Sequence, residues 1–263
     1  MIEKVSLARA GDGLPYCTIA LARGEADPRT DGSRLRAGIS LLVAGNMGRA
    51  RRASDPSYGR LLAALGVEPD RARSIAQIHS RSVVIVDGQS PASMAAAQAD
   101  GMAALRPDLL LTVTVADCLP IFLADRASGA FAIVHSGWKG TGIVIDAIRL
   151  MGERFGTRVH DLAVAIGPGI GPCCYTVPQE RYEEFRQRFG PAAVAGAGAA
   201  RGDFRLDLRR ANVALLEAEG VRDVSVVEEC SCCSPRLGSF RREGPGEFTR
   251  MLAFIGRWPE RRN

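Results

Sequence analysis

Histidine and lysine are scarce in this chain of 263 residues: there are three histidines, and the only lysines are Lys4 and Lys139. Long apolar runs are absent as well. No stretch reaches about 18 uninterrupted apolar residues, so we expect no membrane-spanning helix and no membrane partner. The first residues, MIEKVSLARAGDGL, lack the hydrophobic core of a signal peptide, and we therefore expect the protein to stay in the cytoplasm. The sequence leaves the oligomeric state open.

Acidic residues are fewer than basic ones, 29 against 34, which gives a formal net charge of +5 and a pI of about 9.0. A basic chain can bind nucleic acid. Here, however, the positive charge is almost entirely arginine and is spread along the sequence instead of being clustered. We interpret it as a compositional bias and predict no nucleic-acid partner.

Cysteine occurs seven times, an odd number that includes adjacent pairs. Such a set is a poor framework for disulfides, and a cytoplasmic chain keeps its thiols reduced. Cys230, Cys232 and Cys233 form a C-x-C-C run. This run differs from the C-x2-C pairs of zinc modules, and we expect no second pair to face it. We therefore favour structural thiols over a metal knuckle.

The apolar patterns predict a mixture of strands and helices. Strands are predicted at residues 16–22, 37–44, 75–80, 82–88, 109–115, 120–125, 130–135, 162–166, 204–206, 223–227 and 251–255, and helices at 57–65, 93–105, 143–155, 179–189 and 207–219. Hairpins are expected to join 75–80 to 82–88 and 120–125 to 130–135. The small-residue segment 191–203 predicts a mobile loop. We find no repeat and no linker, and so expect one domain, 1–263, of mixed α/β or α+β class.

Three residues at the ends of apolar runs are the main functional candidates. His79 ends SIAQIH, Cys118 ends LLLTVTVADC, and His135 ends AFAIVH. A single His or Cys at a strand end is usually a packed core residue. Here Cys118 is followed by a strand-breaking proline and His135 by a Gly-rich turn, where a ligand can approach. Two imidazoles and a thiolate form a three-ligand metal site with an open fourth position, which is typical of catalytic zinc.

Six motifs taken together resemble the YfiH family, also called the laccase-domain or multicopper polyphenol oxidase family. They are Q-x-H, A-D-C-x-P, H-x-G-W-[RK]-G-T, I-G-P-x-I-G-x-x-C-Y, S-[FY]-R-R-x-G and a final R-M. The chain carries them in order at residues 77–79, 116–120, 135–141, 166–175, 239–244 and 250–251. It departs from the family pattern at Ser136, Lys139 and Thr249. The N-terminal third fits loosely, because Ser57-Tyr58 stands where relatives have an Asn-Arg pair.

The resemblance implies an α/β fold of its own type, with zinc held by the residues matching His79, Cys118 and His135. It implies phosphorolysis of adenosine, inosine, guanosine or methylthioadenosine to base and pentose 1-phosphate, and adenosine deamination, with phosphate as a co-substrate. The family is also distantly similar to bacterial toxin deamidases that use a Cys–His pair. Some members carry a peptidoglycan-editing description.

Residues around the three ligands are assigned to the rest of the chemistry. We expect Lys139 to contact phosphate, helped by backbone N–H groups of the Gly-rich turn. Asp117 is a candidate proton shuttle or orienting group, although a strand-end cap is an equal alternative. The substrate-binding candidates, some of which could equally be core anchors or surface charges, are Gln77, Trp138, Arg241 and Arg242.

Three alternatives remain open. Three histidines without an H-x-H pair cannot build the trinuclear copper cluster of a laccase, although one copper could occupy the His2Cys site, as in a single-site polyphenol oxidase. A metal-free cysteine hydrolase would use Cys118 as nucleophile and His135 as base. His79 favours the metal, because a dyad does not need a second imidazole. A non-catalytic binding module is the third alternative.

Overall fold

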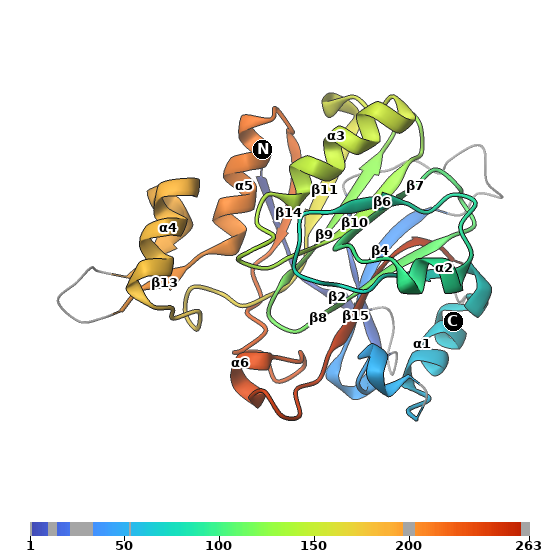
Figure 1. The fold of residues 1–263 in the computed structure, drawn as a ribbon, viewed down its shortest axis with the longest axis horizontal. Coiled ribbons are helices and arrows are strands. Elements are labelled where there is room, and N and C mark those ends of the chain that lie inside the picture. Colours follow the sequence, from blue (N-terminus) through green and yellow to red (C-terminus); the bar gives the residue numbers. More distant parts are fainter. Residues whose placement is uncertain (1, 10–14, 22–33, 53, 197–202, 259–263) are drawn as a thin grey trace.

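The computed structural model describes residues 2–9, 15–21, 34–52, 54–196 and 203–258. Two large sheets and a small ribbon carry the fold (Figure 1). The first sheet has seven strands in the order β1 (Ile2–Val5), β14 (Asp223–Val227), β11 (Leu162–Ile166), β9 (Leu119–Asp125), β10 (Phe131–Ser136), β7 (Gly101–Ala104) and β6 (Val83–Ile85). It is mixed: β9 is antiparallel to β10 and β11, whereas β14 is parallel to β1 and β11.

The second sheet has six strands, and a two-stranded ribbon stands apart from both sheets. The order is β2 (Ala8–Arg9), β3 (Tyr16–Ile19), β4 (Leu35–Ser40), β15 (Met251–Arg257), β8 (Leu110–Val115) and β5 (Ala72–Ser74); the ribbon pairs β12 (Val194–Ala195) with β13 (Arg205–Leu206). The helices are α1 (Ser57–Leu65), α2 (Pro91–Ala96), α3 (Ile143–Phe155), α4 (Gln179–Phe189), α5 (Leu208–Ala218) and α6 (Phe240–Glu243). Short 3-10 turns are η1 (Leu42–Ala44), η2 (Arg49–Arg51), η3 (Pro69–Arg71), η4 (Val159–Asp161) and η5 (Pro191–Ala193).

Strand alternation explains why the layers stack. In β9, Leu119, Ile121 and Leu123 belong to the core that α3 and α5 cover, whereas Phe122 points into the core between the two sheets. Because side chains alternate along a strand, an apolar residue at nearly every position requires cover on both faces. Full burial of a side chain such as Phe122 contributes about 1.5–3 kcal/mol.

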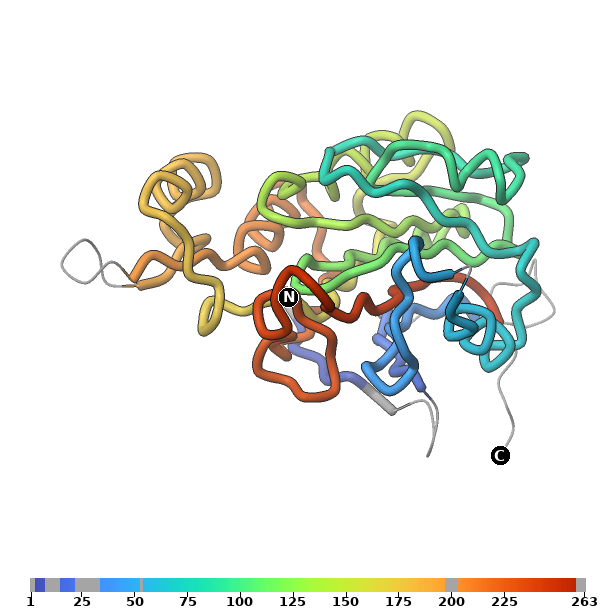
Figure 2. The backbone as a smooth tube through the Cα atoms, turned by 60° about the horizontal axis from the view of Figure 1, so that its bottom comes forward, coloured from blue at the N-terminus to red at the C-terminus, as the bar shows by residue number. Residues whose placement is uncertain are grey.

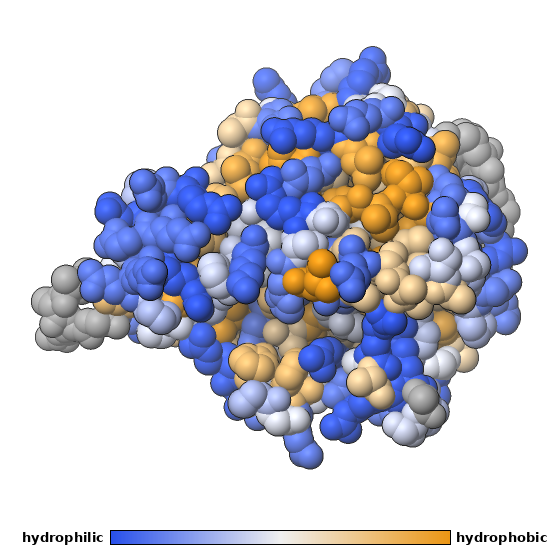
Figure 3. All heavy atoms as spheres, in the orientation of Figure 1, coloured by the Kyte–Doolittle hydropathy of each residue, from blue (hydrophilic) through white to orange (hydrophobic). Residues whose placement is uncertain are grey.

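The six-stranded sheet follows the same rule. In β15, Met251, Ala253 and Ile255 face the inter-sheet core, while Leu252 and Phe254 face a third cluster that includes residues of α1. The chain is therefore layered as helices, sheet, sheet and helix, with β9, β10, β8 and β15 at the centre. α4 and the ribbon project beyond one end of the sheets in both views (Figures 1 and 2). The surface over α4 is strongly hydrophilic (Figure 3).

Most of the predicted elements are confirmed. Helices α1, α3 and α4 and strands β11 and β14 have the predicted bounds, and Gly66 caps α1 in the left-handed region with φ of 68°. The predicted pairing across the turn at residues 126–129 is the β9–β10 hairpin. The α/β class is likewise confirmed. The loop predicted at 191–203 contains η5 and β12, and its residues 197–202 lie outside the described ranges.

Four predictions about the N-terminal half are wrong. Residues 75–80 form an irregular loop, and β6 pairs in parallel with β7, so the expected hairpin does not exist. Of the helix predicted at 93–105, only residues 93–96 are helical, as the end of α2; Ala97 is extended, and β7 begins at Gly101. The end of the strand predicted at 37–44 is the turn η1. His79 consequently lies on a loop and not at a strand end. Within the described ranges, no helix is long and apolar enough to cross a membrane.

Candidate active site

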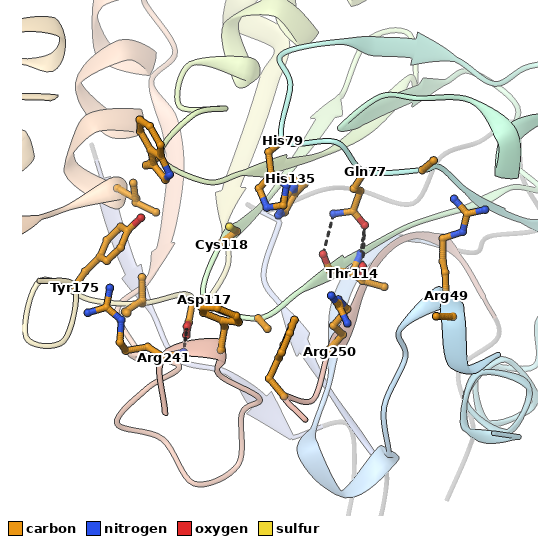
Figure 4. A pocket seen from close by; sticks show the side chains of 18 of the residues that line it. Arg49, Gln77, His79, Thr114, Asp117, Cys118, His135, Tyr175, Arg241 and Arg250 are labelled. Atoms are coloured by element: carbon orange, nitrogen blue, oxygen red, sulfur yellow. Dashed lines mark hydrogen bonds between the residues drawn. The ribbon is translucent and has the colours of Figure 1, made fainter. Parts of the chain in front are cut away.

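A pocket of about 890 Å³ lies at the end of β10, where the β8–β9 turn and the β5–β6 loop meet (Figure 4). Its wall combines side chains from distant parts of the sequence. The lining residues are Arg49, Ala50, Ala76, Gln77, His79, Thr114, Ala116, Asp117, Cys118, His135, Trp138, Ile170, Tyr175, Arg181, Leu208, Phe240, Arg241, Phe248 and Arg250. The three candidate ligands all face this pocket.

His79, Cys118 and His135 converge as predicted, with one donor atom from each lying within 4.8 Å of the other two. His135 is in β10 directly opposite Pro120 of β9, so the turn before β9 brings Cys118 beside it. His79 reaches the same point from the β5–β6 loop, and its ring centroid is 4.9 Å from that of His135. His135 is buried, Cys118 is half-buried and His79 is exposed.

Asp100, which the sequence did not single out, holds the two histidines in place. Its Oδ1 lies 2.9 Å from His135 Nδ1 and accepts from the backbone N–H of His79 at 3.0 Å. Its Oδ2 accepts from the backbone N–H groups of Ile78 and Ser80 and from the Ser80 hydroxyl. The carboxylate is fully buried, so the entire bend of the β5–β6 loop is folded around one negative charge.

Backbone strain coincides with this site. Among the described non-glycine residues, His79 and Asp117 alone have positive φ, at 58° and 85°. Such conformations cost about 1–3 kcal/mol each and persist where the surroundings enforce them. The Asp100 hydrogen bonds enforce the first. The second is held by Asp117 itself, whose Oδ1 accepts from the Ser231 hydroxyl at 2.6 Å and whose Oδ2 accepts from the Arg241 N–H at 2.7 Å.

The electrostatics favour a charged cluster. Burial opposes ionisation of Asp100, but the hydrogen bonds from His135 and Ser80 outweigh it and lower the carboxyl pKa to about 2. Burial raises the pKa of Cys118, but the charge and hydrogen bond of His135, with a hydrogen bond from His79, lower it to about 6. Burial lowers the pKa of His135, yet the Cys118 sulfur and Asp100 raise it to about 9. A thiolate and an imidazolium are thus mutually stabilised.

The donor set fits a metal ion. With Nδ1 of His135 directed at Asp100, its Nε2 remains for a metal, which is the carboxylate–histidine arrangement common around protein zinc. At Gly137 a Cβ would stand 2.7 Å from Cys118 Sγ, so any side chain there would obstruct the sulfur. Two imidazoles and a thiolate suit zinc, and the same set suits copper.

Asp100→Asn is expected to lower the zinc affinity of this site by about 10–100-fold, because a neutral amide supports the His135 ring less strongly. It should also lower the free energy of unfolding near neutral pH by about 2 kcal/mol. The folded-state pKa of Asp100 is depressed, so its stabilisation is present above the unfolded value and is lost as pH falls through about 2. Chelator competition and urea unfolding measure the two effects.

The control for that change is Asp125→Asn, which alters another buried carboxylate. Asp125 lies at the far end of β9, where it accepts from the N–H groups of Ala127 and Ser128 in the hairpin turn. It should lose stability but keep the zinc affinity of the parent. Equal zinc affinity in the parent and in Asp100→Asn would remove Asp100 from the site.

Four other predicted residues line the pocket: Gln77, Asp117, Trp138 and Arg241. The Gln77 amide bridges to Thr114, donating to its carbonyl oxygen at 2.8 Å and accepting from its N–H at 2.8 Å, so Gln77 fixes the loop to β8 (Figure 4). Trp138 is half-buried and the Arg181 guanidinium lies 4.3 Å from its ring centroid. Asp117 has both carboxylate oxygens occupied, which favours the orienting role over a proton shuttle.

Lys139 and Arg242 lie outside the pocket wall. Lys139 is exposed and does not line the pocket; its ammonium lies 5.5 Å from the Trp138 ring. The Gly-rich turn exposes the side chain that follows Trp138. Arg242 donates to the carbonyl oxygens of Ser231, Cys232 and Ser234, so its guanidinium supports a loop and does not reach the pocket. Arg241, in contrast, does line the pocket and donates to the carbonyls of Cys174 and Thr176.

Sequence reasoning missed three further arginines in the pocket wall. Arg49 comes from η2, Arg181 from α4, and Arg250 directly precedes β15. Arg49 supplies a guanidinium from the loosely matching N-terminal third, where an arginine was expected to be missing. The R-M motif could have identified Arg250. No sequence signal distinguishes Arg181 from the other arginines of α4.

The fold and the pocket define a mixed α/β protein with a His–Cys–His site at the end of β10 in the seven-stranded sheet. Comparison with known families agrees with this class. The family model described as multi-copper polyphenol oxidoreductase laccase matches residues 40–258, and the chain belongs to this family.

Relatives carry names related to purine nucleosides. Purine nucleoside phosphorylase YlmD of Geobacillus stearothermophilus is 37% identical over 166 residues, which cover 61% of each chain. A purine nucleoside phosphorylase of Deinococcus radiodurans is 34% identical over 221 residues, covering 78% of this chain and 79% of the relative.

Solved structures share the fold. The crystal structure of Bacillus licheniformis hypothetical protein YfiH superimposes with a TM-score of 0.81 at 26% identity, covering 93% of this chain and 97% of that one. The YlmD crystal structure gives a TM-score of 0.77 at 30% identity and covers 92% and 99%. The predicted resemblance to the YfiH family is therefore confirmed.

Proposed function

We propose that the protein is a zinc-dependent purine nucleoside phosphorylase that cleaves adenosine, inosine, guanosine or methylthioadenosine to base and pentose 1-phosphate. One observation carries the proposal: a single pocket holds the His79–Cys118–His135 donors together with four arginines that form no ion pair among the described residues. The names of YlmD and the Deinococcus relative support it.

The arginines suit a phosphate dianion. Arg49 and Arg250 lie on the Gln77–Thr114 side of the pocket, and Arg241 lies beyond Cys118 on the other side (Figure 4). Burial lowers the pKa of Arg250, and no carboxylate in the described ranges forms an ion pair with it. Arg250 is exposed at the pocket wall, where an anionic ligand would offset its charge, and guanidinium groups bind phosphate in a bidentate manner.

Aromatic side chains in the same wall suit a purine. Phe240 and Phe248 meet edge to face with centroids 5.0 Å apart. Trp138 in the β10–α3 turn and Tyr175 in the β11–α4 loop also line the pocket. Burial, and then the Cys118 charge, raise the pKa of Tyr175 to about 12, so its hydroxyl stays a hydrogen-bond donor. Flat apolar surfaces with one donor match a nucleobase.

In phosphorolysis the bond between the anomeric carbon and the purine nitrogen breaks, and a bond from that carbon to a phosphate oxygen forms. The electrons of the broken bond leave with the purine, which gains a proton. The arginines hold the phosphate against the anomeric carbon and balance its charge in the transition state. Zinc bound by His79, Cys118 and His135 would supply Lewis acidity at the reacting end of the pocket.

Adenosine deamination is a second activity proposed for the same pocket. Water would replace the amino group at C6 of adenine, and phosphate takes no part. The two reactions therefore differ in their need for the arginines, although both use the space beside the His79–Cys118–His135 donors.

The test is product formation from inosine and adenosine by the purified zinc-loaded protein, with and without inorganic phosphate. Phosphorolysis predicts hypoxanthine and adenine release that depends on phosphate, with one pentose 1-phosphate formed per base. Deamination predicts inosine from adenosine in both conditions. Base release that is indifferent to phosphate would contradict the phosphorylase assignment.

A metal-free cysteine hydrolase acting on an amide is the second candidate, and the ionisation of the site favours it. With a Cys118 pKa of about 6 and a His135 pKa of about 9, the metal-free site holds a thiolate–imidazolium pair near neutral pH. Asp100 would complete a nucleophile–base–carboxylate arrangement. His79 has no part in such a triad, whereas a metal site would use all three residues. We therefore favour the metal enzyme over the hydrolase.

A further inference from the structure

Four cysteines from two distant loops meet at a second place in the fold. Cys173 and Cys174 lie between β11 and α4, and Cys230 and Cys233 lie between β14 and α6. One sulfur from each residue lies within 4.8 Å of the other three. The Cys233 Sγ is 3.7 Å from that of Cys173 and 3.4 Å from that of Cys174. The second pair that the sequence was expected to lack is therefore Cys173-Cys174, and it faces Cys230 and Cys233, which are themselves spaced C-x2-C.

These separations match the edges of a metal-centred tetrahedron. A zinc–sulfur bond of about 2.3 Å places tetrahedral sulfurs about 3.8 Å apart. A disulfide would require about 2.05 Å. The cluster thus has four sulfur donors in the number and at the spacing that structural zinc uses, and no fifth position for substrate.

We propose that Cys173, Cys174, Cys230 and Cys233 bind a structural zinc ion as thiolates, at a site separate from His79, Cys118 and His135. Such a site releases the thiol protons when the metal binds and closes its coordination shell with protein ligands alone.

Backbone and side-chain groups around the sulfurs support a negatively charged site. The Gly171 N–H donates to Cys230 Sγ at 3.2 Å, and N–H···S bonds stabilise thiolates. A side chain at Gly171 would crowd the cluster, because its Cβ would lie 3.1 Å from Cys173 Sγ and 3.4 Å from Arg209 Nη1.

Arg209 is the second, independent indication. The residue is 7% exposed, its Nε has no hydrogen-bond partner, and no carboxylate in the described ranges forms an ion pair with it. Its Nη2 donates only to the carbonyls of Gly169 and Glu229, one in each of the two loops. A zinc ion with four thiolates carries a net charge of −2 and would supply the missing counter-charge beside this buried cation.

The position of the cluster suggests what the metal does. It would fasten the β11–α4 loop to the β14–α6 loop, in addition to the Gly169–Cys230 bridge and the hydrogen bonds that already join them. Tyr175 follows Cys174 directly, and the Arg241 guanidinium binds the Cys174 carbonyl. A metal at the four sulfurs would therefore hold two walls of the substrate pocket in register.

The test is the zinc content of the purified full-length protein, measured by elemental analysis, in the parent and in single variants. Cys233→Ser and Cys173→Ser change exposed ligands and are each expected to bind about one zinc less per chain than the parent. Cys232→Ser is the matched control, because this cysteine lies in the same loop but outside the four-sulfur group, and it should keep the parent content. Equal zinc in the parent and in Cys233→Ser would overturn the proposal.

A second measurement keeps all four cysteines of the cluster, so it does not depend on the folding of the cluster variants. Cobalt(II) loaded into the metal-free Cys118→Ala protein should give strong sulfur-to-cobalt charge-transfer absorption, since the four-sulfur site remains intact. A cobalt spectrum without that absorption would overturn the proposal. So would a count of two fewer free thiols than the seven cysteines in parent protein unfolded without reductant, because a disulfide would then occupy the cluster. The zinc contents of the parent and of the cysteine variants differ by the metal of the four-sulfur site alone. This test therefore applies whether or not His79, Cys118 and His135 bind metal.

Discussion

Cys118→Ala is expected to lose about one zinc per chain and to slow phosphorolysis of inosine by about 10³-fold or more, because the removed thiolate is one of three protein ligands and the Lewis acid leaves with it. A loss of that size corresponds to about 4 kcal/mol of transition-state stabilisation. The measurements are elemental analysis and the rate of hypoxanthine formation at saturating phosphate. His79→Ala should behave in the same way.

Two controls separate the metal from the thiol. Cys232→Ala removes a cysteine that belongs to neither the four-cysteine cluster nor the His79–Cys118–His135 site, and this variant should retain activity and metal. Chelation of the parent should abolish phosphorolysis, and added zinc should restore it. The cysteine hydrolase makes the opposite forecast: a metal-free parent that keeps its activity, together with a dead Cys118→Ala and an unaffected His79→Ala, would establish Cys118 as nucleophile and refute the metal assignment.

The sequence predicted local structure correctly where a periodic apolar pattern is followed by a residue or turn that ends the element. Helix α3 follows a Gly-rich turn and ends at Gly156, and α1 ends at Gly66; both glycines adopt the left-handed conformation that a helix C-terminus favours. The β9–β10 hairpin was predictable because both strands are apolar and a short polar turn joins them. In these cases the determinants lie within about fifteen residues of one another.

The prediction failed where a contact distant in sequence decides the local conformation. Residues 75–80 look like a strand because they are apolar, yet they bend around the Asp100 carboxylate, some twenty residues further along the chain. The three candidate ligands could be named, since each ends an apolar run, and Cys118 and His135 are followed by residues that leave room for a ligand. Asp100, the buried carboxylate that contacts His135, could not be identified from the sequence. An aspartate before a strand does not indicate which histidine it contacts on a neighbouring strand.

The same limit applies to the cysteines and to the positive charge of the pocket. Cys173-Cys174 and Cys230 with Cys233 are about sixty residues apart, and the parallel pairing of β11 with β14 brings their loops together. The rarity of lysine drew attention to Lys139, whereas the pocket is lined by arginines that are common in the chain and look alike in sequence. Only the fold distinguishes Arg250 from a surface charge.

Arg250→Ala is expected to lower kcat/KM for phosphate in inosine phosphorolysis by about 10²-fold, because removal of one preorganised donor from an anionic transition state typically costs about 2.7–4 kcal/mol. Arg250 lies in the pocket wall, stacks at 4.1 Å on the Phe248 ring and has no ion-pair partner in the described ranges. Adenosine deamination, which uses no phosphate, should change far less. Rates for both reactions over a range of phosphate concentrations provide the measurement.

Lys139→Ala is the matched control, since it removes one cation from the surface beside the pocket. Its ammonium is exposed and lies outside the pocket wall, so it should slow phosphorolysis by less than about threefold, the effect of a solvent-screened charge. Arg250→Lys should recover only part of the loss, because it keeps the charge but not the planar fork. If Lys139→Ala were as slow as Arg250→Ala, phosphate would bind nearer to the Gly-rich turn than the arginines indicate. If both variants matched the parent, the anion would bind elsewhere and the arginine assignment would be wrong.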